Sequence, residues 1–369
     1  MKTSVQEPHS TFAPPSPAAE APLSDPVEFG PVTIAILGAN FGAKLARQLA
    51  GAGGPVRVVG ICDLDTDKAA ALATELGVPC YAGLDSLLAD PGIEAVGVFT
   101  GPSGRGRLLE RILSAGKHVM TTKPFELDPD EAERAFAAAA RHGRVLHLNS
   151  PAPVPAGDLA CIRRWMADGA LGLPVALHAR TWADYHERAD GSWYDDPERC
   201  PGGPLFRLGV YFLSDFAGLL GRPVEVQVQH TRLRTGRPTP DNAQMTIVYE
   251  GGALATIFAS FCIGDGQAYR DEVLIACEHG TIRRWMLREG GDDMDADRAV
   301  VELQRAGRPV ERHVTAPGDY AGWYGWTAFH QAVRGLPGAV QADAEGTVAS
   351  VRLLAALSEA ANNGGVVRF

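Results

Sequence analysis

Short apolar runs alternate with amphipathic stretches from Val32 onward, and this alternation restricts the fold more than any other feature of the chain. Buried parallel strands are nearly continuous apolar segments, and each parallel pair needs a crossover of a dozen or more residues, usually a helix. The pattern therefore predicts an α/β architecture with a doubly wound parallel sheet over residues 31–150. The expected strands are Val32–Leu37, Val56–Cys62, Ala95–Thr100, Val119–Thr122 and Val145–Leu148.

Two of the intervening helices have recognisable ends. Thr66 is a candidate N-cap for a helix that stops at Gly77, and Asp128 followed by Pro129 begins another that ends before Gly143. Threonine and aspartate cap helix N-termini, proline suits the first helical position, and glycine adopts the left-handed conformation that ends many helices. These boundaries place helices between the strands, as a parallel sheet requires.

The second half of the chain has a different pattern, with longer β-rich runs joined directly rather than through helices. Gly251 and Gly252 are a hairpin turn signal between two of these runs. Directly joined strands predict a largely antiparallel or mixed sheet, and thus a second domain of the α+β class over residues 151–369. The runs are Val175–Trp182, Val224–Leu233, Gln244–Tyr249, Ala253–Phe261 and Glu272–Cys277, with helices expected at Asp158–Asp168, Tyr324–Val333 and Ala344–Ala361.

Length and charge limit the functions that this chain can have. A chain of 369 residues exceeds one ordinary core, which agrees with two domains. A formal net charge of -10 argues against nucleic acid or an anionic membrane surface as a partner, so we expect a small-molecule substrate. No apolar run approaches the ~20 residues that are needed to cross a bilayer.

The cysteines and the N-terminal segment indicate a cytoplasmic protein. The six cysteines are scattered, without a C-x-x-C pair or a metal-ligand spacing, as expected for free thiols in a reducing compartment. Residues 1–30 are rich in proline and alanine and lack the apolar core of a secretory signal. We expect them to form a flexible arm, with docking on a partner subunit as the alternative.

The first strand leads into a glycine-rich turn, Gly38-Ala39-Asn40-Phe41-Gly42-Ala43, and then into an amphipathic helix. A dinucleotide site needs a small residue in the tight turn, little side chain near the pyrophosphate, and a small residue where helix meets strand. Gly38 and Ala43 meet the first and third requirements, whereas Asn40 departs from the usual glycine in the middle. The cofactor-binding candidates of this turn are Gly38, Asn40, Phe41 and Ala43.

An acidic residue follows at the spacing typical of a Rossmann dinucleotide-binding domain. Asp63 ends the second strand, ~20 residues after Ala43, where a carboxylate accepts hydrogen bonds from the adenosine ribose. Because a carboxylate repels a 2′-phosphate, we expect NAD rather than NADP; a structural turn with Asp65 is the alternative. The following strand ends in residues that are candidates either for cofactor contact or for a structural turn, namely Thr100, Gly101, Pro102 and Ser103.

A lysine closes another strand at the same edge of the sheet. In Ala115-Gly116-Lys117-His118-Val119-Met120-Thr121-Thr122-Lys123-Pro124, an apolar strand ends in Lys123, and the proline restricts the backbone there. This stretch resembles the A-G-K-H-V-x-x-E-K-P signature of the glucose–fructose oxidoreductase/inositol dehydrogenase family. The resemblance extends roughly from Val32 to Phe369, and it implies an NAD(P)-dependent oxidoreductase with Lys123 and Pro124 beside the cofactor.

A second block is also similar to that family: Gly202-Gly203-Pro204-Leu205-Phe206-Arg207-Leu208-Gly209-Val210-Tyr211 corresponds approximately to G-G-x-L-x-D-x-G-x-H/Y. In the family, the aspartate, the histidine or tyrosine, and the motif lysine surround the reacting hydroxyl. The resemblance therefore implies that Tyr211 is the acid/base and that Lys123 acts beside it. Two positions depart from the family, because Thr122 replaces a glutamate and Arg207 replaces the aspartate.

Arg207 and Lys123 make the expected site unusually cationic. If the block from Arg207 is helical, Arg207 and Tyr211 are four residues apart and share one face. Two cations near a phenol stabilise the phenolate and lower the pKa of Tyr211 toward the range of a general base. Arg207 is alternatively an anion clamp for an acidic substrate, or a structural arginine. The catalytic candidates are Lys123, Tyr211 and Arg207.

Aromatic and polar residues between the two blocks are candidates for sugar recognition, in which rings stack on C–H faces and polar groups bind hydroxyls. A solvated loop is the alternative for His186, and a turn cap is the alternative for Asn149. No metal-ligand spacing recurs, so no metal is expected. The substrate-binding candidates are Asn149, Trp182, Tyr185, His186, Trp193 and Arg207.

These features favour an NAD-dependent oxidoreductase that transfers hydride between nicotinamide and a secondary hydroxyl or ketone of a sugar, cyclitol or related polyol. A second hypothesis keeps NAD tightly bound and uses transient oxidation for elimination, epimerisation or glycoside cleavage. A third, prompted by the departures at Asn40, Thr122 and Arg207, is a degenerate NAD-binding sensor. The family resemblance also implies a homo-oligomer, a dimer or tetramer.

Overall fold

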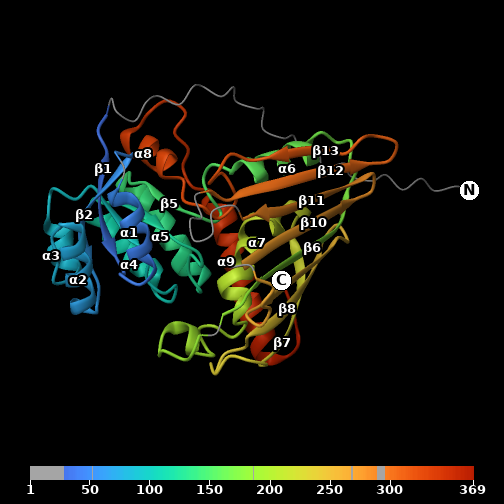
Figure 1. Cartoon of the computed structure of the whole chain (residues 1–369), viewed down its shortest axis with the longest axis horizontal. Helices are drawn as coiled ribbons and strands as arrows, with labels where there is room; N and C mark the ends of the chain where they lie inside the picture. The colour runs from blue at the N-terminus through green and yellow to red at the C-terminus, as the bar shows by residue number, and fades with distance from the viewer. Residues whose placement is uncertain (1–28, 52, 186, 267–268, 289–295) are drawn as a thin grey trace, which may run out of the picture.

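The computed structural model describes residues 29–51, 53–185, 187–266, 269–288 and 296–369. Two β-sheets lie side by side, and a long helix, α9 (Ala344–Asn363), runs between them (Figure 1). None of the helices within these ranges combines the length and the apolarity needed to cross a bilayer. The predicted N-terminal arm falls almost entirely on residues outside the described ranges.

Five parallel strands form the smaller sheet, in the order β2-β1-β3-β4-β5. The chain winds outward in two directions from β1, which confirms the predicted doubly wound fold. The resulting switch point lies between β1 and β3, and ligands of such folds bind at the carboxyl ends of the strands there. The strands are β1 (Val32–Leu37), β2 (Val56–Cys62), β3 (Ala95–Val98), β4 (His118–Thr121) and β5 (Leu146–Leu148).

Helices cover both faces of this sheet and form an apolar cluster with each. The N-cap of α2 is Asp65, whose carboxylate accepts a hydrogen bond from the Lys68 N–H, so the predicted cap Thr66 is instead the first helical residue. Gly77 and Gly143 end α2 and α5 as predicted. One cluster includes α1 (Phe41–Ala50), α2 (Thr66–Leu76) and α8 (Trp326–Arg334), and the other includes α3 (Leu84–Ala89), α4 (Arg105–Ser114) and α5 (Pro129–His142).

Nine strands form the larger sheet, in the order β13-β12-β11-β10-β6-β9-β8-β7-β14. Only β6 and β9 pair in parallel, so the sheet is mixed and largely antiparallel, as predicted. The sequence pattern did not predict the last four strands. The strands are β6 (Pro174–Ala183), β7 (Pro223–Thr231), β8 (Asn242–Tyr249), β9 (Leu254–Ser260), β10 (Tyr269–Cys277), β11 (Gly280–Leu287), β12 (Arg298–Arg305), β13 (Glu311–Val314) and β14 (Val366–Arg368).

One face of the larger sheet is covered by helices, among them α6 (Gly157–Ala167), α7 (Val210–Asp215) and the second half of α9. The first half of α9 packs instead on the parallel sheet, through Val348 and Val351. The C-terminal part of the chain thus returns across the boundary predicted at residue 150. Arg334, at the end of α8, secures this return through a bidentate ion pair with Glu94, with N–O distances of 2.5 and 3.1 Å.

Candidate functional site

The glycine-rich turn places the N-terminus of α1 at the carboxyl edge of the parallel sheet. Gly38 has a φ of +101°, and a Cβ there would lie 2.8 Å from the carbonyl oxygen of Phe99, so the position requires glycine. A Cβ on Gly42 would lie 2.9 Å from Ile36 Cγ2, so Gly42, next to the buried Ala43, allows the close approach of helix to strand. The amides of this first turn suit a pyrophosphate.

Asp63 supports the same turn. Its carboxylate accepts hydrogen bonds from the Ala39 N–H at 2.5 Å and from the Asp65 N–H at 2.8 Å. Asn40 has an ordinary φ of -78°, and its Oδ1 accepts a hydrogen bond from Lys68 Nζ at 2.7 Å. The Asn40 side chain is therefore turned toward α2, and it replaces the usual glycine without left-handed backbone geometry. Ribose binding by Asp63 stays a prediction.

A cleft of about 380 Å³ lies at the carboxyl edge of the parallel sheet and is shared with the second half of the chain. Its walls come from α1, the end of β4, the helical block at 207–216 and a crossing segment at 320–324. The Asn149 side chain joins two of these walls, because it accepts a hydrogen bond from the Lys123 N–H at 3.0 Å and donates one to the Gly322 carbonyl at 2.7 Å. The predicted site residues that line this cleft are Phe41, Lys123, Asn149, Tyr185, Arg207 and Tyr211.

Lys123 extends from the end of β4 into this cleft. Its Nζ donates a hydrogen bond to the Arg207 carbonyl at 2.6 Å and lies 4.4 Å from the centroid of the Tyr211 ring. Burial lowers the pKa of Lys123 to about 7, with help from the positive charges of Arg207 and Arg105 and against the opposing effect of Asp271. A lysine with this pKa exchanges its proton near neutral pH, as an acid/base catalyst must.

Arg105, which sequence reasoning did not select, organises the loops on either side of Lys123. The side chain is buried, and burial lowers its pKa to about 10. Because its partners are backbone carbonyls at the ends of β3 and β4, no residue pattern marks the interaction. The guanidinium donates hydrogen bonds to the carbonyl oxygens of Thr100, Thr122, Pro124 and Phe125.

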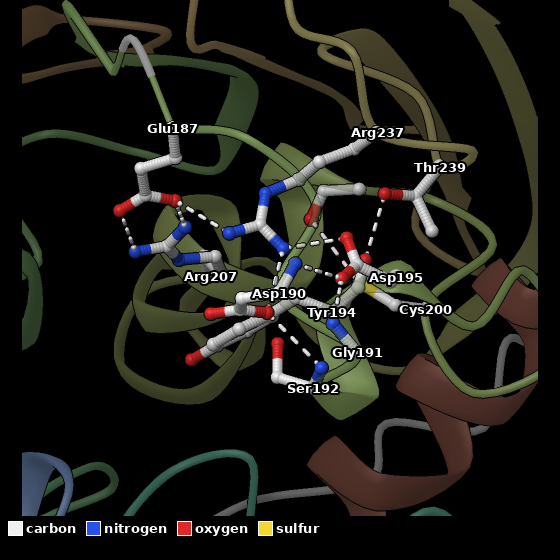
Figure 2. A network of polar contacts seen from close by, with 11 residues as sticks. Glu187, Asp190, Gly191, Ser192, Tyr194, Asp195, Cys200, Arg207, Arg237 and Thr239 are labelled. Carbon is white, nitrogen blue, oxygen red and sulfur yellow. Dashed lines mark hydrogen bonds and ion pairs between the residues drawn. The ribbon is translucent and has the colours of Figure 1, made fainter.

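The predicted anion clamp, Arg207, is already engaged within the chain (Figure 2). Its guanidinium forms a bidentate ion pair with Glu187, and it lies 4.5 and 4.4 Å from the ring centroids of Tyr185 and Tyr194. Arg237 contacts the same Glu187 carboxylate at 3.3 Å. An acidic substrate would have to displace Glu187, so this geometry favours the structural alternative for Arg207.

The block that contains Arg207 is helical, but its first turn is not α-helical. A π-helix, η3 (Leu205–Gly209), precedes α7, and Arg207 and Tyr211 still face the same cleft, as the four-residue spacing predicts. The Arg207 carbonyl rather than its guanidinium meets Lys123. Burial raises the pKa of Tyr185 and of Tyr194, which makes both phenols weaker acids, and the acid/base role of Tyr211 stays a prediction.

Three of the predicted substrate residues lie away from this cleft or outside the description. Trp182 is on the outer face of the larger sheet, where it lies under Arg180 and donates a hydrogen bond to Asp265 at 3.1 Å; its assignment to the substrate site was wrong. Trp193 packs against Gly101 instead. His186 lies outside the described residues.

A second cleft, of about 360 Å³, lies at the carboxyl ends of β2 and β3. The predicted cofactor residues Thr100, Gly101, Pro102 and Ser103 line it, together with Leu64, Arg105 and Trp193. The first cleft also includes Tyr194, which belongs to the aromatic cluster predicted around Trp193. Further residues of this cleft were not indicated by the sequence, because they come from distant parts of the chain: Asp271, Arg284, Tyr320, Trp323 and Tyr324.

The arrangement of the two clefts fits a nicotinamide dinucleotide. The second cleft adjoins Asp63 through Leu64, and the first includes Phe41 at the start of α1 and Lys123 at the end of β4. A dinucleotide in such a fold crosses the carboxyl ends of the strands with its pyrophosphate at the first helix N-terminus. The tight turn that Gly38 allows and the carboxylate of Asp63 therefore occupy suitable positions.

Residues 32–150 match the model of the oxidoreductase family with an NAD-binding Rossmann fold, and residues 159–283 match the model of the GFO/IDH/MocA C-terminal domain. The chain belongs to the GFO/IDH/MocA oxidoreductase family. This is the family that the motifs around Lys123 and Tyr211 resemble, so the resemblance is confirmed.

Relatives with assigned activities match parts of the chain. An inositol 2-dehydrogenase of Ralstonia nicotianae is 31% identical over 156 residues, which are 41% of this chain and 44% of that protein. A galactose 1-dehydrogenase of Pseudomonas fluorescens is 26% identical over 249 residues, which are 67% of this chain and 73% of that protein. Three relatives that are 30% to 31% identical are matched over only 39% to 44% of their own length.

The fold also has solved counterparts. An inositol dehydrogenase homologue from Azotobacter vinelandii, crystallised with NAD+, superposes with a TM-score of 0.73 at 21% sequence identity. The superposition covers 92% of this chain and 98% of that chain. At this identity the likeness concerns the fold alone, and it agrees with the two-sheet architecture.

Proposed function

We propose that this protein is an NAD(H)-dependent oxidoreductase that interconverts a secondary hydroxyl and a ketone on a sugar, cyclitol or related polyol. The observation that carries the proposal is Lys123, whose pKa is about 7 and whose Nζ lies in a cleft between an NAD-binding fold and Tyr211. An amine that changes protonation near neutral pH suits the proton transfer that accompanies hydride transfer. Family membership supports the reaction class.

The residues at the carboxyl edge of the sheet would hold the cofactor. The first turn of α1, beginning after Gly38, would bind the pyrophosphate, and Asp63 would bind the adenosine ribose. Asp65, the other carboxylate at this edge, forms an ion pair with Lys68 at 3.5 Å. The Asp63 carboxylate therefore supports NAD over NADP, because it would repel a 2′-phosphate.

Lys123 would transfer the substrate proton. When bound, the nicotinamide accepts or returns the hydride, and the protein supplies orientation and electrostatics. The neutral amine donates one hydrogen bond to the Arg207 carbonyl and keeps a lone pair that can accept the proton of a substrate hydroxyl. In the reverse direction the ammonium returns that proton to the ketone oxygen. Tyr211, beside Nζ, would bind the same oxygen.

A neutral polyol suits the cleft better than the acidic substrate that Arg207 suggested. Arg207 is paired with Glu187, and the buried Arg284 is paired with Asp158 at 3.0 Å. Asp271 also lines the cleft, where it accepts a hydrogen bond from Thr181 Oγ1 at 2.8 Å and can accept one from a substrate hydroxyl. Both arginines of the cleft therefore have carboxylate partners before any substrate binds.

The test is a spectrophotometric assay of NADH formation with a panel of cyclitols and neutral sugars, each paired with the corresponding sugar acid. We expect oxidation of a neutral member, with Lys123→Met and Tyr211→Phe losing most of that activity while NAD binding persists. Product formation without net NADH would instead support transient oxidation by retained NAD. Wild-type rates in both variants would refute the proposed roles.

A further inference from the structure

Two consecutive residues after β5 contact both sides of the Lys123 cleft. Asn149 accepts a hydrogen bond from the Lys123 N–H and donates one to the Gly322 carbonyl. The next residue, Ser150, donates a hydrogen bond from its hydroxyl group to a carboxylate oxygen of Asp215 at 2.7 Å. Asp215 is 65 residues further along the chain, at the end of α7. The short segment after β5 therefore connects Lys123 to α7.

Asp215 and Tyr211 lie on one side of α7, because residues four apart in an α-helix are neighbours one turn apart. Tyr211 lines the cleft, whereas Asp215 and Ser150 are buried, with 3% and 1% of their surface exposed. The Tyr211 ring also packs against Gly322, where an added Cβ would lie 2.7 Å from Tyr211 Cε1. The ring is thus held from two sides, by the segment that Asn149 contacts and by the helix that Ser150 contacts.

The Asp215 carboxyl group can accept the hydrogen bond in either protonation state. Burial raises the pKa of Asp215 to about 7, and the hydrogen bond from Ser150 opposes this rise. Among the nearby charges, Asp158 raises the pKa further, whereas Arg163 and Arg284 lower it. A neutral carboxyl group keeps a carbonyl oxygen that accepts a hydrogen bond, and so does the side chain of asparagine. Asparagine should therefore replace Asp215 without loss of the contact.

We propose that Asp215 is a positioning residue: its hydrogen bond with Ser150 fixes α7 against the segment after β5 and so sets the distance between Lys123 and Tyr211. The inference rests on the proposed roles of Lys123 and Tyr211. Lys123 Nζ lies 4.4 Å from the centroid of the Tyr211 ring, so both groups can reach one substrate oxygen. A displacement of about 1 Å can lower a rate ~100-fold, and a buried contact between two elements can therefore control kcat without touching substrate.

The experiment compares variants of the two buried residues in the polyol oxidation assay, with NAD binding measured by calorimetry. We expect Asp215→Ala to lower kcat and kcat/KM together by about 10- to 100-fold while NAD affinity changes little. Ser150→Ala should act in the same direction, and Asp215→Asn should keep most of the rate. The double variant of Ser150→Ala and Asp215→Ala should be no slower than Asp215→Ala, because both changes remove one contact.

Thr347→Val is the matched control. The hydroxyl group of Thr347 is buried in α9 and donates a hydrogen bond to the Asp343 carbonyl at 2.7 Å, so the variant also loses one buried hydrogen bond. It should keep the wild-type kcat, because that contact does not join the two sides of the Lys123 cleft.

A second measurement does not depend on turnover. The pH dependence of Lys123 acylation, followed by peptide mass spectrometry, gives the pKa of this lysine, because only the neutral amine reacts. If α7 moves away in Asp215→Ala, water enters and the pKa of Lys123 should rise from about 7 toward the ordinary value of ~10.4. Loss of the negative charge alone would lower this pKa, so a rise identifies a change of position. No rise is expected in Asp215→Asn or Thr347→Val.

The outcomes separate this inference from the proposed function. Wild-type kcat and an unshifted lysine pKa in Asp215→Ala would overturn the positioning role, as would an equal loss of rate in Asp215→Asn or Thr347→Val. If Asp215→Ala does not fold, Ser150→Ala, which leaves the carboxyl group in place, provides the same comparison. If the wild type oxidises no member of the polyol panel, the proposed function fails, and the lysine titration still decides whether Asp215 holds α7 beside Lys123.

Discussion

Replacing Lys123 with arginine separates a proton-transfer role from a purely electrostatic one. Arginine keeps the positive charge at the end of β4, but its guanidinium does not lose a proton in the accessible pH range. Lys123, in contrast, has a pKa of about 7, because its ammonium is buried in the cleft and lies near the positive charges of Arg207 and Arg105. Only the lysine therefore provides a proton-accepting form at neutral pH.

The magnitude follows from the pKa. At about pH 8, a lysine with the ordinary pKa of ~10.4 is neutral in roughly 0.4% of molecules, whereas a lysine with a pKa of about 7 is neutral in roughly 90%. The cleft therefore increases the proton-accepting fraction about 200-fold. Because oxidation needs the neutral amine, its rate should rise as pH increases through about 7 and then level off; reduction needs the ammonium and should fall over the same range.

The assay is the pH dependence of kcat/KM in both directions with the best substrate of the panel. Lys123→Arg should lose oxidation by about 100-fold or more, the usual worth of a general base, while NAD binding measured by calorimetry changes little. Asp271→Asn is the matched charge variant, and it should move the inflection to lower pH because the carboxylate raises the pKa of Lys123. A wild-type profile without an inflection near neutral pH, or full oxidation by Lys123→Arg, would refute the reasoning.

Three further changes have defined outcomes. Gly38→Ala should lower NAD affinity at least tenfold in calorimetry, because its Cβ would clash with the Phe99 carbonyl; unchanged affinity would contradict the role of the turn. Arg105→Met should lower the free energy of unfolding in urea by about 3 kcal/mol, since buried carbonyls lose their hydrogen-bond donor. A loss below about 1 kcal/mol would contradict the role of Arg105 in holding the loops beside Lys123. Glu94→Gln should lower the free energy of unfolding by about 1 kcal/mol at pH 7, because the ion pair of Glu94 with Arg334 is partly exposed to solvent. Because the pKa of Glu94 is lowered to about 2, this difference should be complete above about pH 4.3 and should vanish as pH falls toward 2; a difference independent of pH would exclude the ion pair as its cause.

The parallel sheet was predictable because each of its strands is a short apolar run between helices with clear ends. The last four strands of the larger sheet were not predictable. In β11, for example, Arg283 and Arg284 are consecutive and point to opposite faces, and Arg284 is buried in an ion pair. Strand pairing supplies the partner that such a residue needs, and pairing between distant segments leaves no local signal. The N-cap of α2 is Asp65 rather than the predicted Thr66, because aspartate and threonine are both common N-cap residues and the two are adjacent.

Site residues were predictable where a strand end or a recognisable sequence block places the side chain beside the ligand-binding edge of the sheet. Lys123 follows a strand at the carboxyl edge, and Tyr211 follows a recognisable block, so both were selected and both line the cleft. Trp182 was grouped with a loop cluster, whereas it lies in β6, where alternation turns its side chain to the face opposite the buried Thr181 and Ala183. The partner of Arg207, Glu187, could not be predicted, because it lies 20 residues earlier in a segment without a regular pattern, where Arg237 also contacts it.

The most direct test of hydride transfer in the Lys123 cleft uses a polyol that carries deuterium on the carbon to be oxidised. Mass spectrometry then measures deuterium in the nicotinamide ring of the NADH that is formed. We expect deuterated NADH from the wild type and almost none from Lys123→Met, although that variant still binds NAD. Oxidised product accompanied by unlabelled NADH, or transfer by Lys123→Met at the wild-type rate, would contradict it.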